Sequence, residues 1–406
     1  MLDAKTKSIY LLIMLLGVVS MMGDIVYEGG RGVVPDYLQF LGASAFVVGL
    51  VYGLGDFIGY GVRLLSGYLV DEKRAYWGFM FIGYGLIVAI PLLSIANVWS
   101  VAVLLIILER LGKAIRAPAR DTIVSVVSKG VGVGKAFGLH ELFDQIGAVI
   151  GPLLVSTVMF MTANNYSLSF GLLFIPYFIL IALLFYMFTR LRSKMGEAVA
   201  SRSKRAEGIP KGFYFYIFAV AANVLGLVHV SLILYKASLI LNPSGLQWVV
   251  PLLFTLVQLV DAPSALLSGL LFDRLGLKVL LLPFTVSVIP SIFVYYDSNL
   301  ISLVVASAVY GVVLGMQESI YRAAVVHFAP PSVRGTAYGI FNTIYGVGIL
   351  VSGVVFGFFI DAQIILPLIL AYVVAMQIIA IILLLRSAKL IDVNQKTYVP
   401  IVHSPP

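Results

Sequence analysis

The chain has 406 residues, of which 61% are hydrophobic and only 11% are charged. A soluble protein of this length exposes far more charge, so the composition excludes an ordinary soluble domain and predicts a membrane protein. Cysteine is absent, which excludes disulfide bonds and thiolate metal sites.

Apolar segments of about 20 residues or more follow one another along the chain, the length that a helix needs to cross about 30 Å of hydrocarbon. Spans of a β-barrel would be shorter and would alternate in polarity. We therefore predict an all-α membrane protein with twelve transmembrane helices. They lie at 8–38, 44–66, 76–96, 98–116, 135–161, 166–189, 212–238, 246–271, 278–296, 299–322, 335–360 and 363–386.

The first span is unusually long, and Gly29, Gly30, Gly32 and Pro35 predict a break in it. Two lysines before the apolar run are typical of a signal peptide. No small-residue cleavage site ends the run, so we predict a retained first helix.

Charged residues lie inside the first two spans. Asp24, Glu28 and Arg31 share one stripe of the first helix, and Asp56 and Tyr60 share one of the second. An ionised side chain in hydrocarbon costs several kcal/mol, so it usually faces a cavity or a partner. We predict that these residues contact the substrate or a coupling proton, with a static salt bridge as the alternative.

A basic, hydrophilic stretch at 190–211 separates the sixth span from the seventh. We predict one six-helix bundle at 1–189, a cytoplasmic linker at 190–211, a second six-helix bundle at 212–388 and a cytoplasmic tail at 389–406.

Two residues of the second half join the substrate and coupling candidates. Histidine is the residue type that commonly carries protons near neutral pH, so His229 is a candidate proton relay, although a lone histidine among apolar residues is also typical of packing. Asp261 precedes Ala262 and Pro263, where a carboxylate and a freed carbonyl would line a cavity.

Two predicted loops repeat at a distance of 202 residues. The first reads Gly67-Tyr-Leu-Val-Asp71-Glu-Lys-Arg, and the second reads Gly269-Leu-Leu-Phe-Asp273-Arg-Leu-Gly276-Leu-Lys278. Arg120 and Arg322 have the same separation. Both halves hold six spans and so run in the same direction, which predicts two pseudo-symmetric bundles with a cavity between them near the bilayer midplane.

In these loops the chain resembles the major facilitator superfamily, whose signature is roughly Gly-x-Leu-x-Asp-Arg-x-Gly-Arg-Lys. The second copy matches better, because the first has Glu72 in place of arginine and lacks the later glycine. The resemblance covers essentially the whole chain and implies transport by alternating access.

The repeated loops also predict a cytoplasmic gate. Asp71 is expected near the start of the eleventh span and Asp273 near the start of the fifth, where helix-end N–H groups favour an anion. Arginines would complete charge pairs across the same seam, and solvated, topology-fixing charges are the alternative. These arginines are Arg116, Arg120, Arg274, Arg322 and Arg334.

Gly147, Gly151 and Pro152 of the fifth span resemble the front half of an element that is common in the superfamily's proton antiporters. Ordinary packing of small residues between helices is the alternative interpretation.

Lysine and arginine fall in the loops on one side of the predicted spans and are absent from those on the other. This asymmetry predicts a plasma-membrane protein with both termini in the cytoplasm. The net charge of +8 then faces anionic lipid headgroups, not nucleic acid. We expect a monomer.

Enzyme motifs fail. The stretch 130–135 lacks the residues that a phosphate loop requires, and the helix that begins at His140 lacks the second histidine of a zinc protease. We predict a transporter without a cofactor that uses the proton gradient to export cationic or amphiphilic small molecules. Two alternatives are proton-coupled uptake of a small polar or zwitterionic nutrient, and a non-transporting protein that senses lipids or signals.

Overall fold

The computed structural model describes residues 4–127, 133–191, 209–296, 299–329 and 333–397, and all regular structure in these ranges is helical. Ten stretches are long and apolar enough to cross a membrane. One of them, Val249–Tyr296, contains a long helix, Val249–Leu275, followed by shorter helices that run back in the opposite direction. The helix α4 (Trp99–Val127) is absent from the ten, and its middle turns hold Glu109, Arg110, Lys113 and Arg116.

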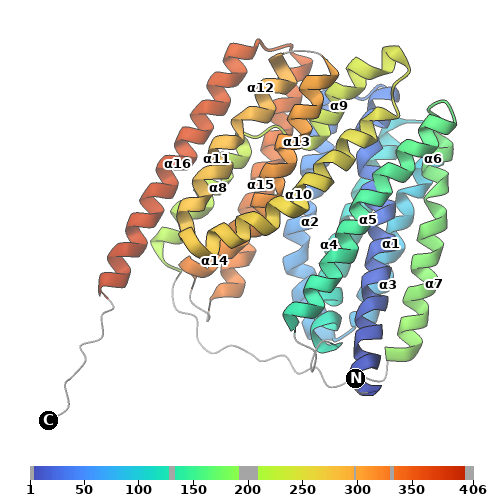
Figure 1. The fold of residues 1–406 in the computed structure, drawn as a ribbon, viewed down its shortest axis with the longest axis horizontal. Coiled ribbons are helices and arrows are strands. Elements are labelled where there is room, and N and C mark those ends of the chain that lie inside the picture. The colour runs from blue at the N-terminus through green and yellow to red at the C-terminus, as the bar shows by residue number, and fades with distance from the viewer. Residues whose placement is uncertain (1–3, 128–132, 192–208, 297–298, 330–332, 398–406) are drawn as a thin grey trace.

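The helices up to α7 form what we call the N half (Figure 1). They are α1 (Ala4–Phe40), α2 (Ala45–Lys73), α3 (Tyr76–Gly85) with η1 (Leu86–Ala89) and η2 (Pro91–Ile95), α4 (Trp99–Val127), α5 (Val133–Met161), α6 (Tyr166–Leu172) and α7 (Phe174–Leu191).

The remaining helices form the C half. They are α8 (Lys211–Leu225), α9 (Val230–Leu241), η4 (Asn242–Ser244), α10 (Val249–Leu275), η5 (Gly276–Leu280), α11 (Leu281–Val286), α12 (Val288–Tyr296), α13 (Leu300–Met316), the π turn η6 (Gln317–Tyr321), α14 (Arg322–Phe328), α15 (Arg334–Asp361) and α16 (Leu366–Thr397).

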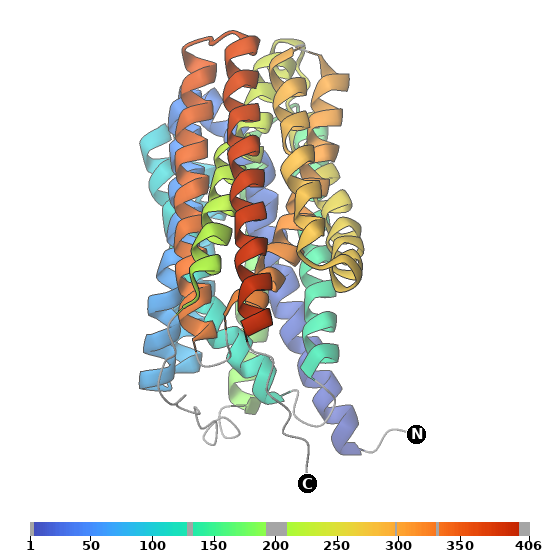
Figure 2. The ribbon, with the colours of Figure 1, turned by 90° about the vertical axis from the view of Figure 1, so that its left-hand side faces the viewer.

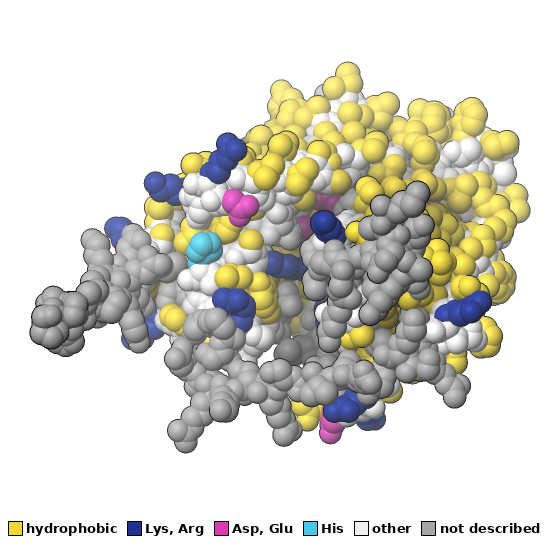
Figure 3. All heavy atoms as spheres, turned by 60° about the horizontal axis from the view of Figure 1, so that its bottom comes forward, with side chains coloured by type: hydrophobic (Ala, Val, Ile, Leu, Met, Phe, Trp, Pro, Cys, Tyr) yellow, Lys and Arg dark blue, Asp and Glu magenta, His cyan; other side chains and the backbone are white. Residues whose placement is uncertain are grey.

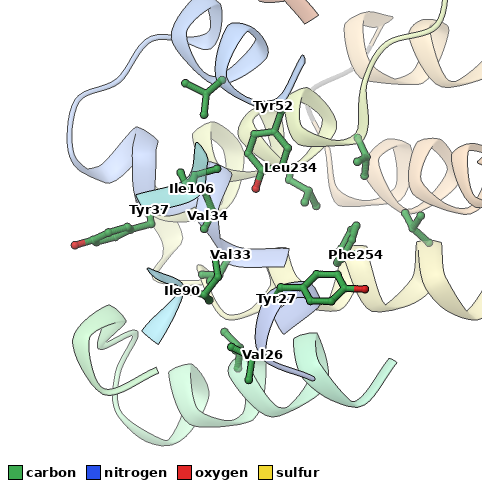
Figure 4. Packing of buried hydrophobic residues seen from close by; sticks show 14 of the residues in the cluster. Val26, Tyr27, Val33, Val34, Tyr37, Tyr52, Ile90, Ile106, Leu234 and Phe254 are labelled. Atoms are coloured by element: carbon green, nitrogen blue, oxygen red, sulfur yellow. The ribbon is translucent and has the colours of Figure 1, made fainter. Parts of the chain in front are cut away.

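The two halves stand side by side, and most of their helices run between the top and the bottom of the molecule as drawn (Figures 1 and 2). They meet where α2 packs against α15, α5 against α10, and α1 against α9. Val33 and Val34 of α1, Tyr52 of α2, Leu234 of α9 and Phe254 of α10 share one buried apolar cluster (Figure 4).

The predicted break in the first span is wrong, because α1 is continuous from Ala4 to Phe40. Pro35 removes the N–H that would bond the carbonyl of Arg31, and the Tyr52 hydroxyl of α2 donates to that carbonyl at 3.1 Å instead. Pro118 of α4 is accommodated in the same way, because the Ser66 hydroxyl donates to the carbonyl of Ala114 at 2.7 Å. Hydroxyl groups of α2 thus replace two lost helical hydrogen bonds.

The seventh predicted span is broken instead. α8 ends at Leu225 and α9 begins at Val230. Side chains of α16 and α15 satisfy carbonyls at the break: the Tyr372 hydroxyl donates to Leu225 at 3.0 Å, and the Ser352 hydroxyl donates to Leu227 at 2.6 Å. Irregular backbone at membrane depth requires such partners.

The two repeated segments are helical, although the sequence predicts loops there. Asp71 lies in the last turn of α2 and Asp273 in the last turn of α10. The turns that follow contain Arg74 and Gly276, both with positive φ, at 51° and 61°. The equivalent positions of the two repeats therefore adopt the same unusual sign of φ, with arginine in one repeat and glycine in the other.

Most of the predicted linker and the end of the predicted tail, 192–208 and 398–406, lie outside the described residues. The last helix runs further than the sequence predicts, because α16 continues to Thr397.

The two ends of the molecule differ in charge. We call the end that carries Lys73, Arg74, Arg190, Arg274 and Lys278 the basic end, and α1 starts there (Figure 1). Blue side chains are scattered over this end, whereas yellow side chains cover the adjoining flanks (Figure 3). Large apolar side chains such as Phe178, Phe185 and Leu385 are exposed along the helices, as expected for a surface in contact with lipid.

Candidate functional site

A cavity of about 960 Å³ lies between the two halves. All seven residues that the sequence predicts for substrate and proton contact line it: Asp24, Glu28, Arg31, Asp56, Tyr60, His229 and Asp261. The cavity extends to the basic end, where Gly138 and Asp273 also line it.

Asp56 of α2 connects the charges at the inner part of the cavity. Its Oδ1 lies 3.2 Å from Nη2 of Arg31 and 3.4 Å from Nη1 of Arg110, and its Oδ2 lies 3.2 Å from Nε2 of His229. Arg31 also contacts Glu28, at 2.8 Å. Asp56–His229 is the one acid–base pair within 4.0 Å that joins the two halves among the described side chains.

The break between α8 and α9 places His229. It is the N-cap of α9, and its Nδ1 accepts a hydrogen bond from the N–H of Ser231 at 3.2 Å. Because Nδ1 is an acceptor, the hydrogen-bond network assigns the ring proton to Nε2, which donates to Asp56. A neutral His229 therefore makes both of these hydrogen bonds. A proton on Nδ1 would remove the hydrogen bond from the N–H of Ser231 that caps α9.

Arg110 of α4 is a site residue that the sequence analysis missed. Its guanidinium is buried, lies over the ring of Tyr52 and contacts Asp56. Lys113, one helical turn away, lies over the ring of Tyr27 and 3.8 Å from Glu28. The i, i+3 spacing of Arg110 and Lys113 was the available signal, since it places both on one face of a charged helix.

The two halves contribute different charge to the cavity. The described lining of the N half holds five carboxylates and five bases: Asp24, Glu28, Asp56, Glu141 and Asp144, with Arg31, Arg63, Arg110, Lys113 and Arg120. That of the C half holds three carboxylates, Asp261, Asp273 and Glu318, against one arginine, Arg322, besides His229. The C half thus supplies the uncompensated negative charge.

Asp261 is the most enclosed of the three C-half acids. It is 2% exposed, and its Oδ1 has no hydrogen-bond partner among the described residues. Its electrostatic neighbours include Glu318 on η6 and Glu141 on α5. A cluster of this kind can accept a proton or a cationic group.

Hydrogen bonds between the halves close the end opposite the basic one. Asn164 of the N half donates to the carbonyl of Gly245 and accepts from the N–H of Trp248, both at 3.0 Å. Asp361 of the C half accepts from the N–H groups of Ala45 and Phe46 at 2.9 and 2.8 Å. The cavity is therefore open toward the basic end and closed at the other.

The predicted gate residues make no ion pair across the seam in the described part of the chain. Arg120 pairs with Asp121 and Asp144 of its own half at 3.0 and 3.4 Å. Arg116 lies between the rings of Tyr27 and Tyr84 inside the N half.

The other gate residues likewise form no ion pair across the seam among the described residues. Asp273 and Arg274 are exposed, and Arg334 begins α15. Arg322 lines the cavity, where its side chain has Tyr60 of the N half as a hydrogen-bond neighbour. The side chain of Asp71 lies outside the described residues. The cavity separates the halves at this end, so the charge pairs that would form the predicted gate are not made among the described residues of this structure, and the gate stays a prediction.

The glycines of the α5 element have a packing role. An added Cβ would lie 2.6 Å from the Met21 carbonyl oxygen at Gly147 and 2.5 Å from that of Ile25 at Gly151. Pro152 packs against Gly32. The close contact of α5 with α1 is enough to explain why both positions are glycine, and the explanation requires no role of these glycines in antiport.

The chain matches known families over its whole length. The model described as Major Facilitator Superfamily matches residues 9–353 and, separately, 212–397. An uncharacterised protein of Mycobacterium tuberculosis is 33% identical over 375 residues, which are 91% of this chain and 90% of that protein. An uncharacterised transporter of the major facilitator type from Methanocaldococcus jannaschii is 27% identical over 359 residues, which are 87% and 88% of the two chains.

A solved structure shows the same fold. The crystal structure of the peptide transporter POT in complex with sulfate aligns with a TM-score of 0.70 and 14% identity, over 93% of this chain and 94% of that one. Together with the family match, this likeness agrees with the cavity between two helical halves. The chain belongs to the Major Facilitator Superfamily and is a multi-pass membrane transporter, not an enzyme.

Proposed function

We propose that this protein is a secondary active transporter that moves a small cationic solute by alternating access and couples the movement to protons. The observation that carries the proposal is a charged cavity between the halves that is open at one end and closed at the other. Twelve spans follow if α4 crosses the membrane and the stretch Val249–Tyr296 crosses it twice. The basic end then faces the cytoplasm of a plasma membrane, and the transport unit is the single chain.

The C-half acids support a cationic substrate. Glu28, Asp56 and Asp144 of the N half each contact an arginine, lysine or histidine. Asp261 has no such partner within 4.0 Å among the described residues, and Glu318 lies nearby. A cation or a proton at Asp261 would neutralise the same buried charge, which makes the two compete.

Such competition supports export in exchange for protons. A substrate cation that binds from the basic end would leave when a proton takes its place from the other side. Proton-coupled uptake of a zwitterionic solute is the second candidate, because Arg31 and Arg110 present a site for a carboxylate opposite the C-half acids.

The test is flux into proteoliposomes that contain the purified protein. A thermal-shift screen of organic cations and zwitterions first supplies a probe. We expect an opposing proton gradient to accelerate movement of the cationic probe. Asp261→Asn should abolish the acceleration, whereas Asp121→Asn, which lies outside the cavity lining, should preserve it. Flux that ignores the gradient in the unmodified protein would refute the coupling, and acceleration by a parallel gradient would favour uptake.

A further inference from the structure

A buried carboxylate lies at the closed end of the molecule, apart from the cavity. Asp36 of α1 is 0% exposed. Its Oδ2 accepts a hydrogen bond from the Tyr166 hydroxyl of α6 at 2.6 Å, and its Oδ1 accepts one from the Ser238 hydroxyl of α9. Tyr166 belongs to the same half as Asp36, but Ser238 belongs to the other. One carboxylate thus joins the two halves where the cavity is closed.

The position of this contact follows from the internal repeat. Asp36 and Ser238 are 202 residues apart, the same separation as Asp71 and Asp273. Equivalent residues of two repeats can touch only close to the axis that relates the repeats. The Asp36–Ser238 hydrogen bond therefore lies near the pseudo-two-fold axis.

A second hydrogen bond supports the first. Asn242, one turn beyond Ser238 on the C half, donates to Gln39, nearly one turn beyond Asp36 on the N half, at 3.0 Å. Asn242 also donates to Ser238 at 2.9 Å. All the partners around Asp36 are neutral amide or hydroxyl groups.

No charged group compensates Asp36 among the described residues. The groups that act on it are Ser238, Tyr166 and Asn242, and the adjacent phenol of Tyr37 bonds elsewhere, to the carbonyl of Ala96. Lys236, the one charged residue of α9, lies on the opposite face of that helix from Ser238. Arg31 of α1 is engaged by Glu28 and Asp56.

We propose that Asp36 is a proton-binding latch, separate from the cavity acids, that favours the closed end when protonated and favours opening when ionised. Burial away from water disfavours an ionised carboxylate that no cation compensates, and opening would return this carboxylate to water. The closed state therefore binds the proton more tightly, and protonation stabilises it. The inference rests on the proposed alternating access, since it assumes that this end opens.

The absence of cysteine allows a direct test in the full chain. Spin labels at Val98→Cys and Ile365→Cys report the separation of the halves at this end, because both positions are exposed and lie in different halves. Double electron–electron resonance is measured without substrate at pH 8 and pH 5. We expect the open-to-closed ratio to fall at pH 5. Asp36→Asn, which is neutral at both pH values, should lower the ratio at pH 8 and should weaken its response to pH, and the cavity acids account for any response that remains.

Matched variants separate a latch from general loosening. Ser238→Ala should favour opening at pH 8, because it removes the hydrogen bond that joins Asp36 to the other half. Tyr166→Phe should leave the ratio unchanged, because its bond to Asp36 lies within one half and persists in both states. Asp36→Glu, which keeps the charge, should keep the response to pH.

An equal pH response in Asp36→Asn and the unmodified protein, or equal opening in Tyr166→Phe and Ser238→Ala, would overturn the proposal. The readout is a distance between two labels and does not depend on transport. If the protein moved no solute but showed the expected shifts, the proposed function would be refuted and the proposed latch would stand.

Discussion

Contacts of single residues show where sequence reasoning succeeded and where it stopped. Helical spacing predicted that Asp24, Glu28 and Arg31 share a face, and the structure places all three at the cavity. It could not predict that Asp56 meets His229, because 173 residues separate them and only the packing of α2 against α9 brings them together. Asp36 was missed for the same reason, because its partners Tyr166 and Ser238 lie on other helices.

The missing glycine of the first signature copy leads to a prediction about Arg74. This residue ends α2 in the left-handed region, with φ 51° and ψ 25°, where a side chain costs about 1 kcal/mol and glycine does not. We expect Arg74→Gly to raise the apparent Tm of the purified protein.

The equivalent residue of the second repeat provides the matched control. Gly276 has φ 61° and ψ −143°, a region that is essentially restricted to glycine. Gly276→Ala should therefore lower the apparent Tm. If Arg74→Gly lowered it as well, the left-handed backbone at Arg74 would not be the cost to stability that we infer.

At the scale of whole helices, the runs of apolar residues predicted where most helices lie but not whether each helix is continuous. Four helix-breaking residues predicted an interruption of α1, yet the Tyr52 hydroxyl satisfies the carbonyl that Pro35 leaves free. No proline marks the break before α9, and its carbonyls depend on Ser352 and Tyr372 from distant helices. Helix continuity in the membrane is thus decided by partners on neighbouring helices, which local sequence does not reveal.

The contact between α2 and α15 predicts a strong effect of one added methyl group. A Cβ at Gly49 would overlap the backbone carbonyl of Gly353, and backbone cannot turn away as a side chain can. We expect Gly49→Ala to lower the apparent Tm and the yield of folded protein. Gly61→Ala on the same helix should be neutral or mildly stabilising, because nothing lies within 4 Å of its added Cβ and alanine favours a helix. Equal effects of the two changes would refute this account of the seam.

For the whole molecule, the repeat predicted the cavity between the halves but not which end is open. One sequence must stabilise both states of a transporter. The sequence can therefore show which charges at the basic end are able to pair, but not whether they pair in a given state. In this structure Asn164, Asp361 and Asp36 join the halves at the other end, in addition to the Asp56–His229 pair inside the cavity.

Orientation in the membrane can be tested because the chain has no cysteine of its own. Met161→Cys is exposed at the closed end and Lys278→Cys is exposed at the basic end. If the basic end is cytoplasmic, a membrane-impermeant maleimide added to intact cells should label Met161→Cys, and it should label Lys278→Cys only after permeabilisation.

A third cysteine extends the same test to the cavity. Ser319→Cys lines the cavity near Gly269 and should react only from the basic end while that end is open. Labelling of Lys278→Cys in intact cells would invert the proposed topology. Labelling of Ser319→Cys from both sides, one after the other as a substrate is added, would show that this cavity is the one whose access alternates.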